Sequence, residues 1–180
     1  MKRRPGRVVR ASRPALLLVL ILALLLAARL LRPPTPTPAD VIRQSEPHAV
    51  ARVIDGDTLL LTSGQRVRLI GVDTPETKHP DEPVDPLGVE AGEFVRSLIA
   101  DGPVRLEFDR ERLDRYERLL AYVWLPDGRL LNDEIIRAGY SAAQTGYSYR
   151  QDMKRRFLES EAQARAQGQG MWQAPTVQVR

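Results

Sequence analysis

The chain has no cysteine and only two histidines, His48 and His79, among its 180 residues. The absence of cysteine excludes a disulfide framework, a thiolate metal site, a cysteine nucleophile and a lipid anchor on cysteine. Two histidines are too few for a zinc site built from several imidazoles. Any metal site in this chain must therefore be built mainly from oxygen ligands.

Acidic residues are missing from the first 38 positions, and this gap changes the meaning of the net charge of +4. Residues 1–38 carry eight basic side chains, whereas the other 142 residues hold 19 basic and 23 acidic side chains, a net charge of −4. The basic character belongs to the N-terminus and does not indicate a nucleic-acid-binding surface on the remainder. The length and the 43% of hydrophobic residues fit one globular domain.

Polar side chains are also absent from Ala15 to Ala28, a run of 14 residues that follows six positive charges. Leucine on every face argues against an amphipathic core helix and predicts a signal peptide or signal-anchor over residues 15–31. Because small residues do not occupy the alternate positions that signal peptidase requires, we expect an uncleaved single-pass anchor in the cell membrane. Residues 1–14 would then be cytoplasmic and the rest extracytoplasmic. Secretion after cleavage is the alternative.

Four prolines within Pro33–Pro38 exclude helix and sheet and predict an extended spacer. We therefore expect a proline-rich linker over residues 32–47. A globular domain should follow over residues 48–174, with a tail at residues 175–180.

Within this domain, apolar or alternating runs bounded by glycine and proline turns predict five β-strands. They lie at residues 50–54, 58–62, 66–72, 104–108 and 119–125. Helical spacing predicts helices at residues 91–99 and 150–166 and a short helix that ends near Gly139. This order of elements is typical of an α+β fold, and five short strands favour a small closed barrel over an open sheet.

The carboxylates of Asp57, Asp73 and Glu76 could converge, because the end of the third strand in a meander can lie close to the turn between the first two. Taken alone, the Asp55–Asp57 segment is typical of a hairpin turn, and the proline after Thr74 could simply end a strand. Convergence would create repulsion that only a cation or protonation relieves. A cluster of carboxylates and carbonyls suits Ca²⁺, Mg²⁺ or Mn²⁺.

A charge run, residues 112–118, precedes the last predicted strand. Such a run is usually a solvated face. Near a metal, two of its arginines could instead hold a phosphodiester, because the guanidinium fork matches two phosphate oxygens.

Together these segments resemble the staphylococcal nuclease (thermonuclease) family from about Val50 to Trp172. The motifs that carry the resemblance are Val53–Thr58, Arg68–Pro80, Asp114–Tyr122, Tyr147–Tyr149, and Ser160–Ala164 followed by Met171 and Trp172. The resemblance implies a five-stranded OB-fold barrel with about three helices. It also implies an endonuclease that hydrolyses single-stranded or unpaired DNA and RNA with Ca²⁺ and leaves 3′-phosphate products. No obligate protein partner is evident, and residues 15–31 would be the contact with the membrane.

The resemblance also implies a role for particular residues. Asp57, Asp73 and the Thr74 carbonyl correspond to ligands of Ca²⁺, and Asp55 corresponds to an outer-shell neighbour. Glu76 corresponds to the carboxylate that orients or deprotonates the attacking water.

The resemblance further implies that two arginines, Arg68 and Arg118, grip the scissile phosphate. The positions that correspond to other substrate contacts are Arg115, Tyr116, Tyr147 and Tyr149.

One residue departs from the family pattern, because Glu117 stands where glycine is usual. Its carboxylate could compete with the substrate phosphate for Arg118. A catalytically weak or silent OB-fold module that binds nucleic acid is the alternative function, since this fold also hosts pure binders. A membrane-tethered scaffold is a third possibility. The complete set of carboxylates and arginines favours the nuclease, because neither alternative requires it.

Overall fold

The computed structural model describes residues 21, 24, 46–76 and 85–173. The chain separates into one unit of residues 1–36 and another of residues 37–180. In the first unit only Ile21 and Leu24 are described, and both are helical and exposed. Nearly all of the expected anchor and linker therefore lies outside the described residues, as does the tail. Within the described ranges, no helix is long and apolar enough to span a membrane.

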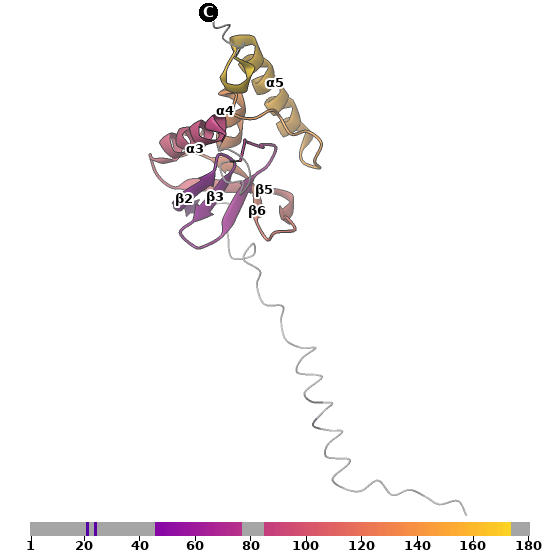
Figure 1. The fold of residues 1–180 in the computed structure, drawn as a ribbon. Coiled ribbons are helices and arrows are strands. Elements are labelled where there is room, and N and C mark those ends of the chain that lie inside the picture. The colour runs from indigo at the N-terminus through magenta and orange to yellow at the C-terminus, as the bar shows by residue number, and fades with distance from the viewer. Residues whose placement is uncertain (1–20, 22–23, 25–45, 77–84, 174–180) are drawn as a thin grey trace, which may run out of the picture. The chain divides into compact units, whose positions relative to one another are not determined.

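The second unit is built on one mixed sheet of six strands in the order β1-β5-β6-β4-β3-β2, which curves into a nearly closed barrel (Figure 1). The strands are β1 (Pro47–His48), β2 (Val50–Asp55), β3 (Thr58–Leu61), β4 (Arg66–Leu69), β5 (Val104–Leu113) and β6 (Leu119–Trp124). Strands β2, β3 and β4 form an antiparallel meander. Strand β4 then pairs in parallel with β6, which lies antiparallel to β5.

All five predicted strands are present, but the count of five was one too low. Strand β1 is only two residues long, so it is too short to show an alternating pattern, and it pairs with the start of β5. Strand β5 also continues to Leu113, five residues beyond the predicted end. A register shift between Phe108 and Leu113 interrupts its pairing with β6, so no clean alternation marks that half of the strand.

Three α-helices accompany the sheet: α3 (Pro86–Ile99), α4 (Leu131–Arg137) and α5 (Gln151–Gln167), and a short 3₁₀ helix, η1 (Gly170–Trp172), follows α5. Helix α3 begins five residues earlier than its apolar spacing indicated. Asp85 caps it by accepting a hydrogen bond of 2.8 Å from the Leu87 N–H, and Pro86 suits the first helical turn. Helix α5 ends at Gly168, whose φ of 60° places it in the left-handed region that favours glycine.

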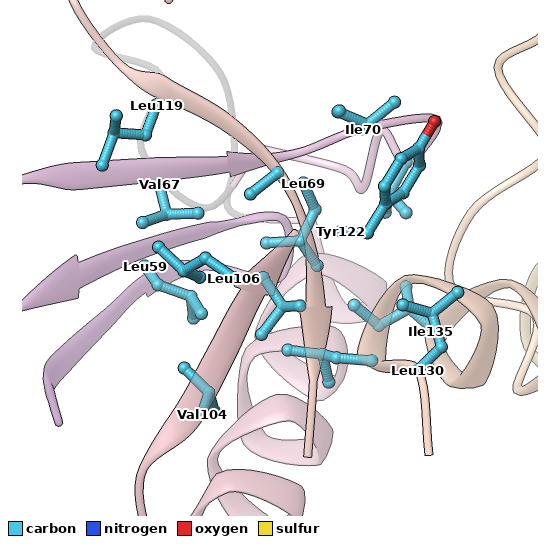
Figure 2. Packing of buried hydrophobic residues seen from close by; sticks show 14 of the residues in the cluster. Leu59, Val67, Leu69, Ile70, Val104, Leu106, Leu119, Tyr122, Leu130 and Ile135 are labelled. Carbon is cyan, nitrogen blue, oxygen red and sulfur yellow. The ribbon is translucent and has the colours of Figure 1, made fainter. Parts of the chain in front are cut away.

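The core fills the barrel and continues toward α4 and α5. Figure 2 shows Leu59 of β3, Val67 and Leu69 of β4 and Leu106 of β5 pointing toward one another, with Leu130 and Ile135 at one end. The buried Asn132 of α4 accepts a hydrogen bond of 2.9 Å from the Val123 N–H and donates one of 2.9 Å to the Ile70 carbonyl. These bonds tie α4 to β6 and to the segment that leaves β4, which carries several of the predicted site residues.

A buried carboxylate joins the last two α-helices. Asp133 of α4 is fully buried and pairs at 3.0 Å with both Arg137 and Arg156, while Ser160 donates a hydrogen bond of 2.5 Å to it. Removing one partner of a buried pair is strongly destabilising, because it leaves an uncompensated charge. This cluster holds α5 in place and therefore serves the fold.

Candidate active site

The turn between β2 and β3 meets the segment that follows β4, as the sequence suggested. The carboxylate of Asp57 accepts hydrogen bonds from the Thr74 N–H at 3.0 Å and from its hydroxyl at 3.3 Å. Glycine is required at position 56 for this approach, since a Cβ there would lie 2.9 Å from the Thr74 side chain. The same contact brings Asp73 and Glu76 to the Asp57 turn.

The guanidinium of Arg68 lies between two of the predicted cation ligands. Its Nη1 forms an ion pair of 2.6 Å with Asp57, and its Nη2 donates a hydrogen bond of 2.7 Å to Asp73. The carboxylate of Asp57 is buried, whereas the side chain of Asp73 is 60% exposed. A protein cation therefore already balances these two carboxylates.

The carboxyl of Glu76 lies in the field of the neighbouring acids. Although Glu76 is exposed, the loss of solvating water on its cleft side raises its pKa above the usual 4.5, and the charges of Asp55, Asp57 and Asp73 raise it further. The charge of Arg68 acts in the opposite direction. Glu76 therefore lies within electrostatic range of the three aspartates.

The second predicted phosphate ligand, Arg118, is held by an acid within its own turn. One oxygen of Asp114 accepts hydrogen bonds from the Tyr116 N–H at 2.8 Å and the Arg118 N–H at 2.9 Å, while the other accepts from Arg118 Nε at 2.6 Å. Burial by itself would raise the pKa of Asp114, but these hydrogen bonds outweigh it and lower the pKa. Sequence reasoning assigned Asp114 no role. The signal that could have identified this role is that aspartate side chains in turns often accept a hydrogen bond from the backbone N–H two residues later, here that of Tyr116.

The position of Glu117 explains why glycine suits this turn. Its φ is +59°, and among the described residues it is the only non-glycine residue with a positive φ. The left-handed conformation costs a residue with a Cβ, and glycine avoids that cost. The predicted competition for Arg118 has no counterpart in the structure, where Asp114 and not Glu117 pairs with that guanidinium.

Three arginines surround Tyr116, which is 53% exposed. Arg115 donates a hydrogen bond of 2.7 Å to its hydroxyl and lies 4.7 Å above its ring, and Arg118 lies 5.3 Å from the ring centre. Arg66 donates a hydrogen bond of 3.1 Å to its backbone carbonyl. Each guanidinium gains a cation–π contact or a hydrogen bond from this one residue.

Two hollows meet at these side chains. The larger, of about 500 Å³, is lined in part by Asp109, Glu111 and Tyr147. The smaller, of about 330 Å³, contains Asp57 and Glu76. Their shared wall is formed by Arg68, Tyr116 and Arg118. A group held by Arg68 and Arg118 would therefore lie between the larger hollow and the carboxylates of the smaller one.

The two tyrosines that were predicted to contact substrate have different surroundings. Tyr147 is 72% exposed and lines the larger hollow. Tyr149 also borders this hollow but is only 8% exposed, and its ring packs 6.1 Å from that of Phe157. Burial raises the pKa of the Tyr149 hydroxyl to about 12, and this hydroxyl has no hydrogen-bond partner among the described residues. Tyr149 therefore packs in the core at the border of the larger hollow, whereas Tyr147 is open to it, and the substrate contacts of both tyrosines stay predictions.

The donor set fits a hard cation with few protein ligands. Asp57 and Asp73 offer oxygen donors, which Ca²⁺ and Mg²⁺ prefer. Over residues 46–76 and 85–173, no group of three or more acidic or histidine side chains is arranged as a metal site. The guanidinium of Arg68 lies against both aspartates and pairs with one oxygen of each.

Comparison with known proteins identifies relatives over most of the described unit. Residues 66–174 match the family model described as staphylococcal nuclease homologue. The thermonuclease of Staphylococcus intermedius is 44% identical over 127 residues, which cover 69% of this chain and 73% of the relative. The thermonuclease of Staphylococcus hyicus is 42% identical over 123 residues, 67% of this chain and 70% of the relative. The endonuclease YncB of Bacillus subtilis is 37% identical over 127 residues, 67% of this chain and 59% of the relative.

Proposed function

The chain belongs to the staphylococcal nuclease family and is a thermonuclease-like enzyme, and we propose that it is a Ca²⁺-dependent endonuclease for single-stranded or unpaired DNA and RNA that leaves 3′-phosphate products. One observation supports this proposal above others: two guanidiniums, Arg68 and Arg118, line the hollow that holds Asp57 and Glu76. Phosphodiester hydrolysis needs positive charge at the phosphate and a carboxylate near the water. This hollow offers both.

The cation would be held by Asp57, Asp73 and the Thr74 carbonyl. When bound, Ca²⁺ supplies positive charge that stabilises the negative charge developing on the phosphate oxygens. Few protein carboxylates imply weak affinity, nearer the extracellular range of about 10⁻⁴–10⁻³ M than that of a cytosolic sensor.

The two arginines would bind the phosphate from different starting states. Arg118 donates its Nε–H to Asp114, so the turn holds the guanidinium in place and both terminal nitrogens can donate to the phosphate. To bind the phosphate, Arg68 would release Asp57 and Asp73, and the oxygens of these two carboxylates would then hold the cation. Phosphate oxygens can accept both prongs of a guanidinium, so this exchange preserves its hydrogen bonding.

The carboxylate of Glu76 would take a proton from the attacking water. A general base works best when its pKa approaches the working pH, and the neighbouring acids move the pKa of Glu76 in that direction. Its exposed position leaves room for water.

The test is cleavage of a labelled single-stranded oligonucleotide by the purified full chain in Ca²⁺, in Mg²⁺ or in chelator. We expect cleavage only in Ca²⁺, with product ends that a phosphatase alters. The variant Asp57→Ala should raise the Ca²⁺ concentration required, whereas Asp101→Ala, at an exposed aspartate in the turn after α3, should leave it unchanged. Equal cleavage in chelator and in Ca²⁺ would refute the metal requirement. Binding without cleavage in every metal would support the silent binding module.

We also propose that residues 15–31 anchor the chain in the cell membrane with the nuclease outside. The support is the run of 14 apolar residues after six positive charges. Protease added to intact cells should destroy or release the nuclease. Full protection of the nuclease in intact cells would contradict this orientation, and a mature N-terminus within residues 27–34 would favour secretion.

A further inference from the structure

A third arginine, Arg66, shares its strand face with Arg68. Side chains alternate along a strand, so residues two apart lie on one face about 6.6 Å from each other. The burial of β4 follows this rule, because Val67 and Leu69 are buried and the two arginines are not. The rise of two residues is comparable with the spacing of neighbouring phosphates along an extended nucleic-acid strand.

Arg66 is fixed at one side of the site. It lines the smaller hollow together with Asp57 and Glu76, but it is not part of the larger hollow. Its Nη2 donates to the carbonyl of Tyr116, 50 positions away in the sequence, at 3.1 Å. This bond uses one of the five N–H donors of the guanidinium and leaves the others available.

Arg66 differs from the other two arginines in that no ion pair holds it within residues 46–76 and 85–173. Arg68 is paired with two aspartates and Arg118 with Asp114. In the part of the chain that the structure describes, no acidic side chain forms an ion pair with Arg66. Arg115 also lacks such a pair there, but it lines the larger hollow and not the smaller one.

We infer that Arg66 binds the phosphate adjacent to the scissile one, on the side of the strand that crosses the smaller hollow. This inference rests on the proposed nuclease function. With the scissile phosphate between Arg68 and Arg118, one flanking nucleoside faces the larger hollow and Tyr147. On the other side of the scissile phosphate, the nucleic-acid strand then passes Arg66, whose guanidinium can bind two phosphate oxygens. Substrates with at least two consecutive phosphates are therefore preferred over dinucleotides with one.

The experiment compares a dinucleotide that contains one phosphate with a single-stranded oligonucleotide, both cleaved by the full chain. The variant Arg66→Gln removes the charge but keeps an N–H donor for the Tyr116 carbonyl. We expect it to lower kcat/KM for the oligonucleotide about tenfold more than for the dinucleotide, the usual scale for a charge-assisted hydrogen bond. The matched control, Arg105→Ala, removes an exposed arginine of β5 outside both hollows and should change neither value.

Binding is measured separately, by fluorescence anisotropy of the labelled oligonucleotide at several salt concentrations in the presence of Ca²⁺ and a Glu76→Gln background. The slope of log affinity against log salt concentration should become less negative by about 0.7 in Arg66→Gln, the value for one phosphate contact on a single strand. Arg66→Lys keeps the charge and should have the slope of the unmutated chain. An unchanged slope in Arg66→Gln would overturn the inference, as would an equal loss of kcat/KM on both substrates. If the unmutated chain cleaved neither substrate, the proposed function would fail, and the salt slope would still decide the role of Arg66.

Discussion

Replacing Glu117 by glycine should stabilise the protein, because Glu117 holds a backbone conformation that disfavours a Cβ. Its φ of +59° lies in the left-handed region. The turn around it is closed by hydrogen bonds from the Glu117 N–H to the Asp114 carbonyl at 3.1 Å and from the Asp114 N–H to the Arg118 carbonyl at 3.0 Å. These bonds keep Glu117 in that conformation.

The magnitude follows from two opposing contributions to the free energy of unfolding. A non-glycine residue in the left-handed region costs about 1–2 kcal/mol. Glycine also raises the conformational entropy of the unfolded chain, which lowers the free energy of unfolding by about 0.4–1 kcal/mol and opposes the gain. The net stabilisation expected for Glu117→Gly is about 1 kcal/mol, or about 3–5 °C in Tm for a folded unit of this size.

The assay is urea unfolding and thermal unfolding with two comparison variants. Glu117→Ala removes the same charge but leaves a Cβ, so its stability should stay near that of the unmutated chain. Glu93→Gly places glycine at an exposed position inside α3, where it should destabilise by about 1 kcal/mol. A loss of stability in Glu117→Gly similar to that in Glu93→Gly would refute the reasoning.

The same variants test whether Glu117 affects catalysis. Because Asp114 pairs with Arg118 at 2.6 Å, we expect Glu117→Ala to leave kcat/KM unchanged at low salt. A higher kcat/KM at low salt in both Glu117 variants would show that the Glu117 carboxylate draws Arg118 away from the substrate after all.

Three further predictions concern side chains of the site. Asp114→Asn should lower kcat/KM on the order of tenfold by releasing Arg118. Because the pKa of Asp114 is lowered, its stabilising contribution is present above pH 3.8 and is lost as the pH falls through the folded pKa. In urea titrations, the unfolding free energies of the two proteins should therefore converge as the pH falls below 3.8. Tyr149→Phe should leave KM unchanged and raise the free energy of unfolding by about 1 kcal/mol, because it removes a buried hydroxyl that has no hydrogen-bond partner among the described residues. Tyr147→Ala should raise KM. A raised KM in Tyr149→Phe and an unchanged KM in Tyr147→Ala would assign the substrate contact to Tyr149. Glu76→Gln should lower kcat by a factor of about 10²–10⁴ with little change in KM, and a changed KM alone would remove its role at the water.

Local patterns in the sequence determined most of the strands and the position of the site. Alternation marks β4 and the first half of β5, whereas short apolar runs bounded by turns mark β2, β3 and β6. A meander of adjacent strands also made an approach of the Asp57 turn to the end of β4 possible, and the hydrogen bond from the Thr74 N–H to Asp57 shows that it occurs.

Only the tertiary structure decided which side chains are open to the hollows and which charges are already paired. Tyr147 and Tyr149 stand in one short motif, yet packing against Phe157 of α5 buries only the second. Arg66 joins the site through a carbonyl 50 positions away, and the left-handed backbone of Glu117 depends on the hydrogen bonds of its turn. Contacts between segments that are distant in the sequence produce no local periodicity of side chains, because they depend on how the whole chain folds.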